Sequence, residues 1–257
     1  MNNSSSLIHN NYGYAIYFKE EEEIMIQNQQ GQMHQNMHTG MVPPQMNHGG
    51  HEVIDVQEVL SSTILAMDQY LLLRQYAKDP ELIDIMVRQY QFMQEEYNIT
   101  LECFRTGQDP SQHTKKYMMK QDNDFTYGLK QSSPKKPMQS LGEVSDEFIS
   151  NCMLTSCKSG ASMKTMAALE STNPVVRRVL ADSIPNCIEM AYEISIYQNK
   201  HHYYQVPQLA QQDMNQMQNA YAPAQGRMPM NNMNTNNMNM SGMMNNMNMG
   251  TMNNQSH

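Results

Sequence analysis

The feature that most constrains the fold is a pattern that occurs twice, in which two long apolar stripes flank an Asp or Asn followed by Pro. Asp79-Pro80 and Asn173-Pro174 each separate two segments whose apolar residues recur every three to four positions. This spacing places side chains on one face of an α-helix. Asp and Asn are favoured as helix N-caps, and Pro is favoured at the first helical position. The pattern therefore predicts two antiparallel helical hairpins.

Each predicted helix is defined by its apolar positions. The first hairpin carries the stripes Val53, Val56, Leu60, Ile64, Met67, Leu71 and then Leu82, Met86, Tyr90, Met93, Tyr97, Leu101, Phe104. The second carries Val144, Phe148, Cys152, Thr155, Met163, Met166, Leu169 and then Val176, Val179, Ile184, Cys187, Ala191, Ile194. We expect the helices of the first hairpin to run from His51 to about Lys78 and from Pro80 to Gly107. Those of the second hairpin should run from near Gly142 to the Asn173-Pro174 turn and from Pro174 to about Tyr204. Pro185 should kink the last helix.

The segment between the two hairpins is unusually long. Residues 106–140 lose the helical period and collect Gly107, Pro110, Gly128, Pro134 and Pro137. Connections between neighbouring helices usually have about 2–8 residues. Two hairpins joined by one long crossover form the ferritin-like variant of the four-helix bundle. We therefore predict an all-α, ferritin-like four-helix bundle, with an ordinary up-down bundle as the alternative.

The composition of the two ends differs from that of the helical segments. The chain has 28 Met, no Trp and only 16% charged residues, and no charged residue follows Arg227. Segments of this kind cannot bury enough apolar area to offset the entropy of ordering them. We predict a disordered Gln/Asn/Met/His-rich arm over residues 1–50, a helical domain over 51–204, and a disordered Met/Asn/Gln-rich tail over 205–257. Most Met residues belong to the arms, and a few are core residues of the helices.

The overall charge and hydropathy exclude several classes of protein. A net charge of −8 disfavours a nucleic-acid binder, since phosphate attraction needs clustered basic residues. No apolar run approaches the roughly 20 residues of a membrane span. We also find no basic region followed by an apolar one at the N-terminus, so no signal peptide is predicted.

The acidic run Glu20–Glu23 just before Met25 has two interpretations. Purine-rich Glu codons resemble a bacterial ribosome-binding site. In the first interpretation the residues before Met25 come from an untranslated leader that has been read in frame, and Met25 is the native start. The alternative is an acidic disordered arm, the usual interpretation of a short charge block. The intact mass of the native protein distinguishes the two.

Candidate sites for chemistry are few. The four cysteines, Cys103, Cys152, Cys157 and Cys187, lie in predicted helices without a C-x-x-C motif, so we interpret them as free core thiols rather than as a disulfide or a metal site. A di-metal site in a ferritin-like bundle needs two Glu-x-x-His motifs, and the predicted helices have none. We therefore interpret their carboxylates as solvent-facing: Glu95, Glu96, Glu102, Glu189 and Glu193.

Two His-containing clusters remain as weak metal candidates. The first lies in the N-terminal arm and combines thioethers with imidazoles, a donor set that suits copper(I): Met33, His34, Met37, His38, Met41, Met46, His48 and His51. The second is His201-His202-Tyr203-Tyr204, which is either a metal or dityrosine site or simply a helix end. We favour low complexity for the first and a helix end for the second. With no nucleophile or phosphate-binding motif either, we predict no enzymatic activity and no cofactor.

One segment resembles a known family. Asn173–Leu180, Ile188–Tyr192, Tyr197-Gln198 and His201–Tyr204 resemble the last helix of the spore coat protein F family, and Ser156–Glu170 fits its third helix. The resemblance covers about residues 143–214, with a looser extension back to His51, and leaves out the tails. It implies a ferritin-like domain in the coat of an endospore, made in the mother-cell cytoplasm. The family is not known as catalytic, so the resemblance implies no active-site residues.

These observations lead to one hypothesis and one alternative. We expect a non-enzymatic structural component of the spore coat that associates with other coat proteins and with itself through its bundle and its low-complexity arms. Cross-linking of exposed Gln, Lys and Tyr is a further hypothesis. The alternative is a metal-handling protein, either a ferritin-like di-metal oxidase or a Met/His copper binder.

Overall fold

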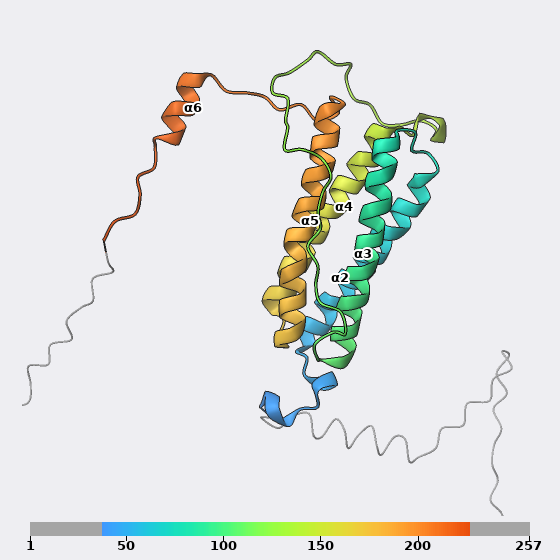
Figure 1. The fold of residues 1–257 in the computed structure, drawn as a ribbon, viewed down its shortest axis with the longest axis vertical. Coiled ribbons are helices and arrows are strands. Elements are labelled where there is room, and N and C mark those ends of the chain that lie inside the picture. The colour runs from blue at the N-terminus through green and yellow to red at the C-terminus, as the bar shows by residue number, and fades with distance from the viewer. Residues whose placement is uncertain (1–37, 227–257) are drawn as a thin grey trace, which may run out of the picture. The chain divides into compact units, whose positions relative to one another are not determined.

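Four long helices make up most of the described chain. The computed structural model describes residues 38–226. Its long helices are α2 (Gly50–Arg74), α3 (Pro80–Thr106), α4 (Asp146–Glu170) and α5 (Pro174–Lys200), with the short 3-10 turns η1 (Thr39–Met41), η2 (Pro44–Met46) and η3 (Leu141–Glu143) between or before them (Figure 1). Within residues 38–226 there is no β-strand, only an isolated bridge between Tyr127 and Val206. The predicted all-α class is confirmed.

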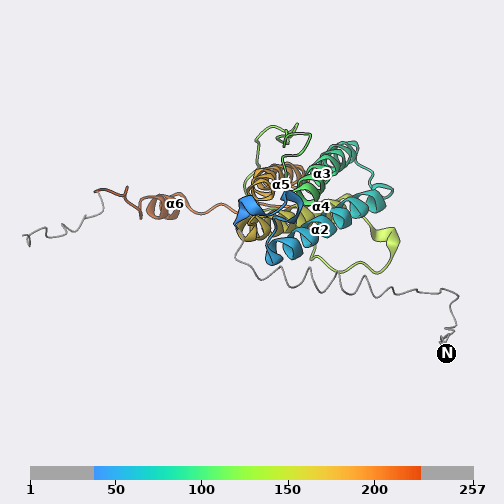
Figure 2. The same cartoon turned by 90° about the horizontal axis from the view of Figure 1, so that it is seen from below.

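The helices pack side by side with a defined order and direction. α2 contacts α3 and α4, and α5 contacts the same two helices from the other side (Figure 2). At one end, the N–H of Lys78 in the α2–α3 turn donates to Asp146 at the start of α4, at 2.9 Å. At the other end, the N–H of Gly49 before α2 donates to Thr172 in the α4–α5 turn, at 2.8 Å. Hence α3 runs parallel to α4, and α2 runs parallel to α5.

Local chemistry sets the two turns as predicted. Asp79 is the N-cap of α3 and accepts a hydrogen bond from the N–H of Glu81, at 2.9 Å. Asn173 is the N-cap of α5 and its side-chain oxygen accepts from the first turn of that helix. α3 ends at Gly107, whose φ of +66° and closeness to the Pro44 carbonyl leave no room for a β-carbon. These turns satisfy backbone groups that a helix end would otherwise leave unpaired.

Some predicted boundaries differ from the structure. α2 ends at Arg74 rather than near Lys78, because the backbone N–H of Lys78 is bound by Asp146 instead of by a helix carbonyl. α4 begins at Asp146, capped by Ser145, rather than near Gly142. α5 continues as a helix through Pro185.

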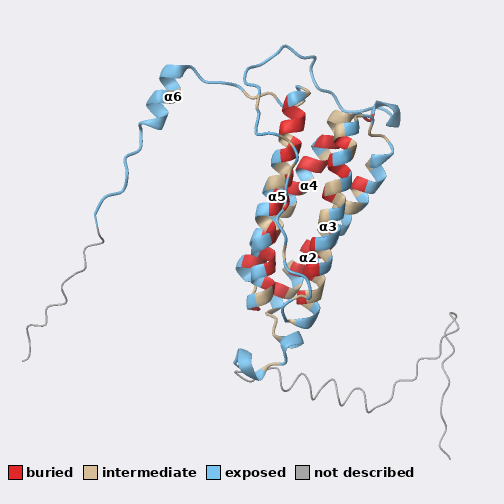
Figure 3. Ribbon diagram, in the orientation of Figure 1, coloured by how far each residue is buried: buried red, intermediate tan, exposed pale blue. Residues whose placement is uncertain are grey.

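The core lies where the four helices face one another (Figure 3). The predicted stripe of α5 is largely confirmed, since Val176, Val179, Cys187 and Ile194 are buried. On α3, Leu82, Met86 and Met93 are buried as expected, while the other predicted positions are half-buried. On these two helices the apolar spacing identified most of the buried face.

The predicted stripes of α2 and α4 are partly wrong. Ile64 and Leu71 of α2 are exposed, as are Thr155, Met166 and Leu169 of α4. The buried side of α4 is instead formed by Ile149, Ser150, Met153, Leu154, Cys157, Lys164, Ala167 and Ala168. Large apolar residues are buried in the first half of α4. In its second half Lys164, Ala167 and Ala168 are buried while Met166 and Leu169 are exposed, so counting apolar residues misidentified the buried face there.

A short helix lies in the segment predicted as a disordered tail. α6 (Gln211–Gln218) belongs to a second compact unit that begins at Leu209. None of the residues of α6 is buried. The rest of the predicted tail from residue 227, and the first 37 residues of the predicted arm, lie outside the described residues. None of the described helices has the length and apolar character needed to cross a membrane.

Candidate functional site

The interface between α3 and α5 contains a buried network around Glu193. Glu193 is fully buried and its carboxylate accepts hydrogen bonds from Arg88 at 2.7 Å, from Gln89 at 3.1 Å and from the Tyr117 hydroxyl. Arg88 also donates to the Tyr117 oxygen, at 2.7 Å. Gln89 in turn accepts a hydrogen bond from the buried hydroxyl of Tyr70 on α2, at 2.7 Å. The network therefore ties three helices and the crossover together.

The electrostatics of this network are those of a satisfied ion pair. Burial opposes the charge of Arg88, but its hydrogen bonds to Glu193 and Asp84 outweigh that effect and raise the Arg88 pKa. Burial, reinforced by the neighbouring Glu193, raises the pKa of the Tyr117 hydroxyl well above its usual value. Arg88 is thus charged and Tyr117 neutral at physiological pH, so Tyr117 acts as a donor to the carboxylate.

A second buried ion pair lies further along the bundle. Lys164 of α4 donates to Glu96 of α3 at 2.9 Å, and the two side chains are both 9% exposed. Asn186 of α5 donates to the other oxygen of Glu96, at 2.6 Å. Burial alone lowers the pKa of Lys164, but the Glu96 carboxylate outweighs it and the net pKa is raised. Both charges are therefore compensated, as a buried charge requires.

These two pairs overturn part of the sequence-based interpretation. Glu96 and Glu193 were expected to face solvent, and both are buried. Their cationic partners are distant in the chain, with Lys164 lying 68 residues from Glu96 and Arg88 lying 105 residues from Glu193. Spacing within one helix cannot reveal such pairs. The only available signal was that each carboxylate directly precedes a residue of the apolar stripe, Tyr97 for Glu96 and Ile194 for Glu193.

The crossover follows α3 and α5 in an extended conformation held by side chains of α5. Asn186 accepts a backbone N–H and donates to a backbone carbonyl of residues 115–117, both at 2.9 Å. Asn199 does the same with Thr126, at 2.7 and 3.0 Å. Glu193, between them, accepts one more backbone N–H from the segment, at 3.1 Å. Buried amide side chains therefore satisfy backbone groups that have no helix or sheet partner.

A third buried carboxylate closes the opposite end of the bundle. Glu52, in the first turn of α2, accepts hydrogen bonds from His48 at 2.7 Å and from the N–H groups of Thr172 and Asn173 at 2.8 and 3.0 Å. Burial raises its pKa, but these hydrogen bonds outweigh burial and the net pKa is lowered. Glu52 thereby joins the start of α2 to the α4–α5 turn.

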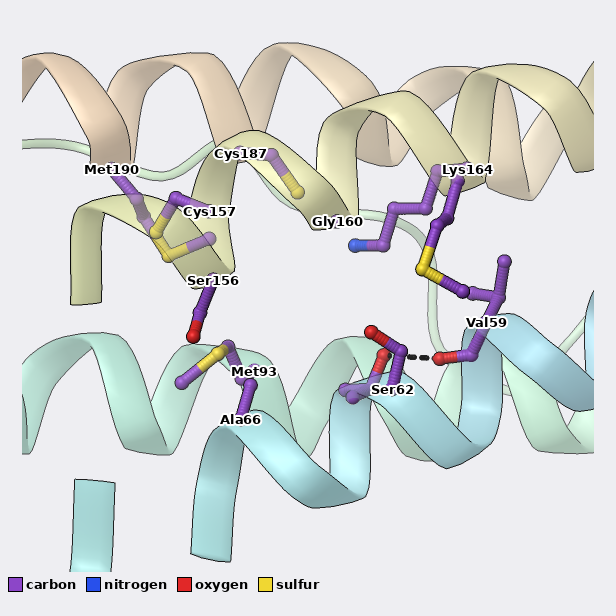
Figure 4. Close-up of a pocket in the computed structure, with 12 residues that line it drawn as sticks. Val59, Ser62, Ala66, Met93, Ser156, Cys157, Gly160, Lys164, Cys187 and Met190 are labelled. Carbon is purple, nitrogen blue, oxygen red and sulfur yellow. Dashed lines mark hydrogen bonds between the residues drawn. The ribbon is translucent and has the colours of Figure 1, made fainter. Parts of the chain in front are cut away.

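A small cavity lies among the helices near the bundle centre (Figure 4). Its volume is about 30 Å³ and its lining contains an unusual number of sulfur atoms. The lining residues are Val59, Ser62, Thr63, Ala66, Met93, Ser156, Cys157, Gly160, Met163, Lys164, Cys187 and Met190. Figure 4 shows Cys157, Cys187 and Met190 directed toward the same space, with the Lys164 ammonium at its edge. The cavity thus collects residues that the sequence distributes over four helices.

The cysteines are free thiols, as predicted, and their environments differ. Cys103, Cys157 and Cys187 are buried, and Cys152 is half-buried. Burial raises the pKa of Cys157 to about 12 and that of Cys103 to about 12. Burial also raises the pKa of Cys187, although the Lys164 ammonium opposes part of that rise. All are therefore protonated and weakly nucleophilic at neutral pH.

The structure separates the histidines that the sequence proposed as metal candidates. His38 and His51 are exposed, and His48 is held by Glu52 at the start of α2. His201 and His202 lie at the far end of α5. Met33, His34 and Met37 lie outside the described residues. Among the residues that the structure describes, no group of three or more His, Cys, Asp and Glu side chains is placed to hold a metal ion.

The His-Tyr cluster forms a helix end, as we favoured. His201 is the C-cap residue of α5, with its N–H donating to the Tyr197 carbonyl at 3.2 Å. Its ring lies 4.5 Å from that of Tyr197 and stacks on Tyr203 at 5.5 Å between centroids. The Nε2 atom of His201 is 3.3 Å from the Asp79 carboxylate that caps α3. The cluster therefore covers the bundle end where α3 begins and α5 stops.

Comparison with known proteins identifies the helical region. The Coat F domain family matches residues 145–207, which include α4, α5 and the His-Tyr end. The spore coat protein F-like protein YhcQ of Bacillus subtilis (strain 168) is 58% identical over 181 residues, which cover 70% of this chain and 83% of YhcQ. The chain belongs to the spore coat protein F family. This confirms the resemblance inferred from the last two helices.

The Coat F domain match contains one side of each buried network. The Coat F domain match contains Lys164, Asn186, Glu193 and Asn199, whereas Arg88, Glu96 and the crossover lie before it. Each buried network therefore joins the matched hairpin to the preceding part of the chain. No solved structure matches this member of the spore coat protein F family.

Proposed function

We propose that the chain is a non-enzymatic structural component of the spore coat, the location that its family gives it. The observation that carries this proposal is the 58% identity to a spore coat protein F-like protein over most of both chains. The packing of the described residues supports a structural role. Glu96 and Glu193 are each paired with a cation, and three buried carboxylates serve as connectors between helices and turns.

We further infer that α2–α5 form the ferritin-like variant of the four-helix bundle. Two observations support this: α3 and α4 run parallel, and the crossover between them follows the length of the bundle along α5. In metal-binding bundles of this type, inward carboxylates hold the ions. Here Lys164 and Arg88 neutralise Glu96 and Glu193, which favours structure over di-metal chemistry. An experimental structure with α3 and α4 antiparallel would contradict the inference.

Assembly is proposed to use both the helical domain and the arms. The helical domain spans residues 51–204, and the arm and tail span 1–50 and 205–257. The outer side of α2 supports association, because four large apolar side chains on it are between 42% and 69% exposed: Ile64, Leu65, Leu71 and Leu72. Exposed apolar groups gathered in this way are typical of protein–protein contacts. The expected partners are other coat proteins and further copies of this chain.

The location and the assembly mode can be tested separately. A fluorescent fusion expressed from the native promoter should form a shell around the developing spore, and uniform mother-cell fluorescence throughout sporulation would contradict the proposal. Self-association of the purified full chain should fall in a Leu65→Lys/Leu72→Lys variant, measured by sedimentation velocity. Ser159→Lys, at an exposed position of α4 instead of α2, is the control for an added lysine and should associate as the unmodified chain does.

A further inference from the structure

We propose that the sulfur-lined cavity between the helices binds one soft monovalent metal ion, copper(I), through Cys157, Cys187 and a Met thioether. This site is separate from the His/Met arm considered from the sequence, and it lies beyond the structural function proposed above. The ion would be held inside the bundle rather than at its surface.

The donor set is the first argument. Five of the twelve lining residues carry sulfur, and they come from three helices: Met93 of α3, Cys157 and Met163 of α4, and Cys187 and Met190 of α5. Thiolate and thioether ligands are soft and select copper(I) over hard ions such as magnesium or calcium. The other two cysteines, Cys103 and Cys152, do not line the cavity.

The size of the cavity is the second argument. Protein interiors are close-packed, and a cavity needs about 10–15 Å³ to hold one water molecule. The cavity offers about 30 Å³, enough for one ion and a small shift of its ligands. Gly160 helps to keep this space open, since a β-carbon there would lie 3.8 Å from the Cys187 sulfur. Val59 and Ala66 give the cavity apolar walls, and Ser62, Thr63 and Ser156 add hydroxyl groups to its lining.

Charge balance is the third argument. Copper(I) replaces the protons of the two thiols, so that Cu⁺ and two R–SH give [Cu(SR)₂]⁻ and two H⁺ that leave to solvent, with no change in oxidation state. The complex carries one negative charge, and the buried Lys164 ammonium lines the same cavity. Lys164 already pairs with Glu96, so its ammonium lies close to two anions, that carboxylate and the bound complex. Proton release also makes binding weaker as the pH falls.

The test uses the reduced full chain titrated with copper(I) against a chromophoric copper(I) chelator. One equivalent should bind with an ultraviolet thiolate-to-copper charge-transfer band. Cys157→Ser and Cys187→Ser should each abolish the band, while Cys103→Ser and Cys152→Ser should keep it at full intensity. A band that persists in Cys157→Ser, or that is lost equally in Cys103→Ser, overturns the proposal.

A second measurement avoids any variant that folds poorly. X-ray absorption at the copper edge, on the unmodified chain loaded with one equivalent, should show a first shell of sulfur alone. A shell containing imidazole nitrogen would place the ion on histidines and overturn the cavity site. Circular dichroism of each Cys→Ser variant confirms that its helices are intact. Either result leaves the coat localisation test unaffected, so the two proposals fail independently.

Discussion

Replacing Lys164 with Met should reveal the cost of an uncompensated charge inside the bundle. The variant keeps most of the side-chain volume but leaves the Glu96 carboxylate, 9% exposed, with the Asn186 amide as its described partner. Removing one member of a buried ion pair costs about 3–5 kcal/mol. This is a large part of the roughly 5–15 kcal/mol by which a domain is stable. With a urea slope of about 2 kcal/mol per molar, the unfolding midpoint should fall by about 1.5–2.5 M.

The pH dependence distinguishes lost charge compensation from lost packing. A carboxylate left alone in the interior is tolerated best when it is protonated, so the destabilisation should shrink as the pH is lowered from 7.5 to 5. The double variant Glu96→Gln/Lys164→Met should recover more than half of the loss at pH 7.5. Lys158→Met, an exposed position on the same helix, is the control and should change stability by less than about 0.5 kcal/mol. A loss below 1 kcal/mol, or one equal at both pH values, would refute the reasoning.

Three further predictions concern Glu52, Tyr117 and the cysteines. The pKa of Glu52 is lower in the folded protein than its ordinary value of 4.5, so the stability that Glu52 contributes is fully present above pH 4.5 and is lost as the pH falls through the folded pKa. Glu52→Gln should therefore cost about 1–3 kcal/mol at pH 7. In thermal unfolding scans below pH 4.5 the cost should become progressively smaller. Tyr117→Phe removes a hydrogen-bond donor to Glu193 and should lower the free energy of unfolding, measured in urea, by about 1–3 kcal/mol. Tyr127→Phe, at an exposed position, is the control and should leave it unchanged. Equal losses in the two variants would contradict the network. Burial raises the pKa of Cys157 to about 12, whereas Cys152 is only half-buried. Iodoacetamide at pH 8 should therefore label Cys152 first in the native protein and all four cysteines in urea, as measured by peptide mass spectrometry. Early labelling of Cys157 in the native protein would contradict its burial.

The helices and their turns were accessible from the sequence because their causes are local. Asp79-Pro80 and Asn173-Pro174 combine an N-cap with a residue suited only to the first helical turn, and the structure places both as predicted. Gly107 ends α3 for an equally local reason, because its backbone takes the left-handed conformation that glycine adopts readily. On α5 the apolar period also identified Val176, Val179 and Ile194 as buried, although it did not identify the buried polar residues of that helix.

The same reasoning could not identify the buried face of α4 or the copper(I) candidate site. Met166 and Leu169 are apolar yet exposed, while Lys164 is charged yet buried. The burial of Lys164 is explained only by its ion pair with Glu96 on another helix. The cavity likewise forms only when four helices bring Cys157, Cys187 and their neighbours together.

What the sequence by itself determined is therefore the set of helices, their order, the two hairpin turns and the family. What the tertiary structure alone decided is which polar groups enter the interior. The free energy of a buried charge depends on a partner that lies 68 or 105 residues away, as for Glu96 and Glu193, and no local pattern encodes that distance. A helix, by contrast, is specified by residues three and four positions apart.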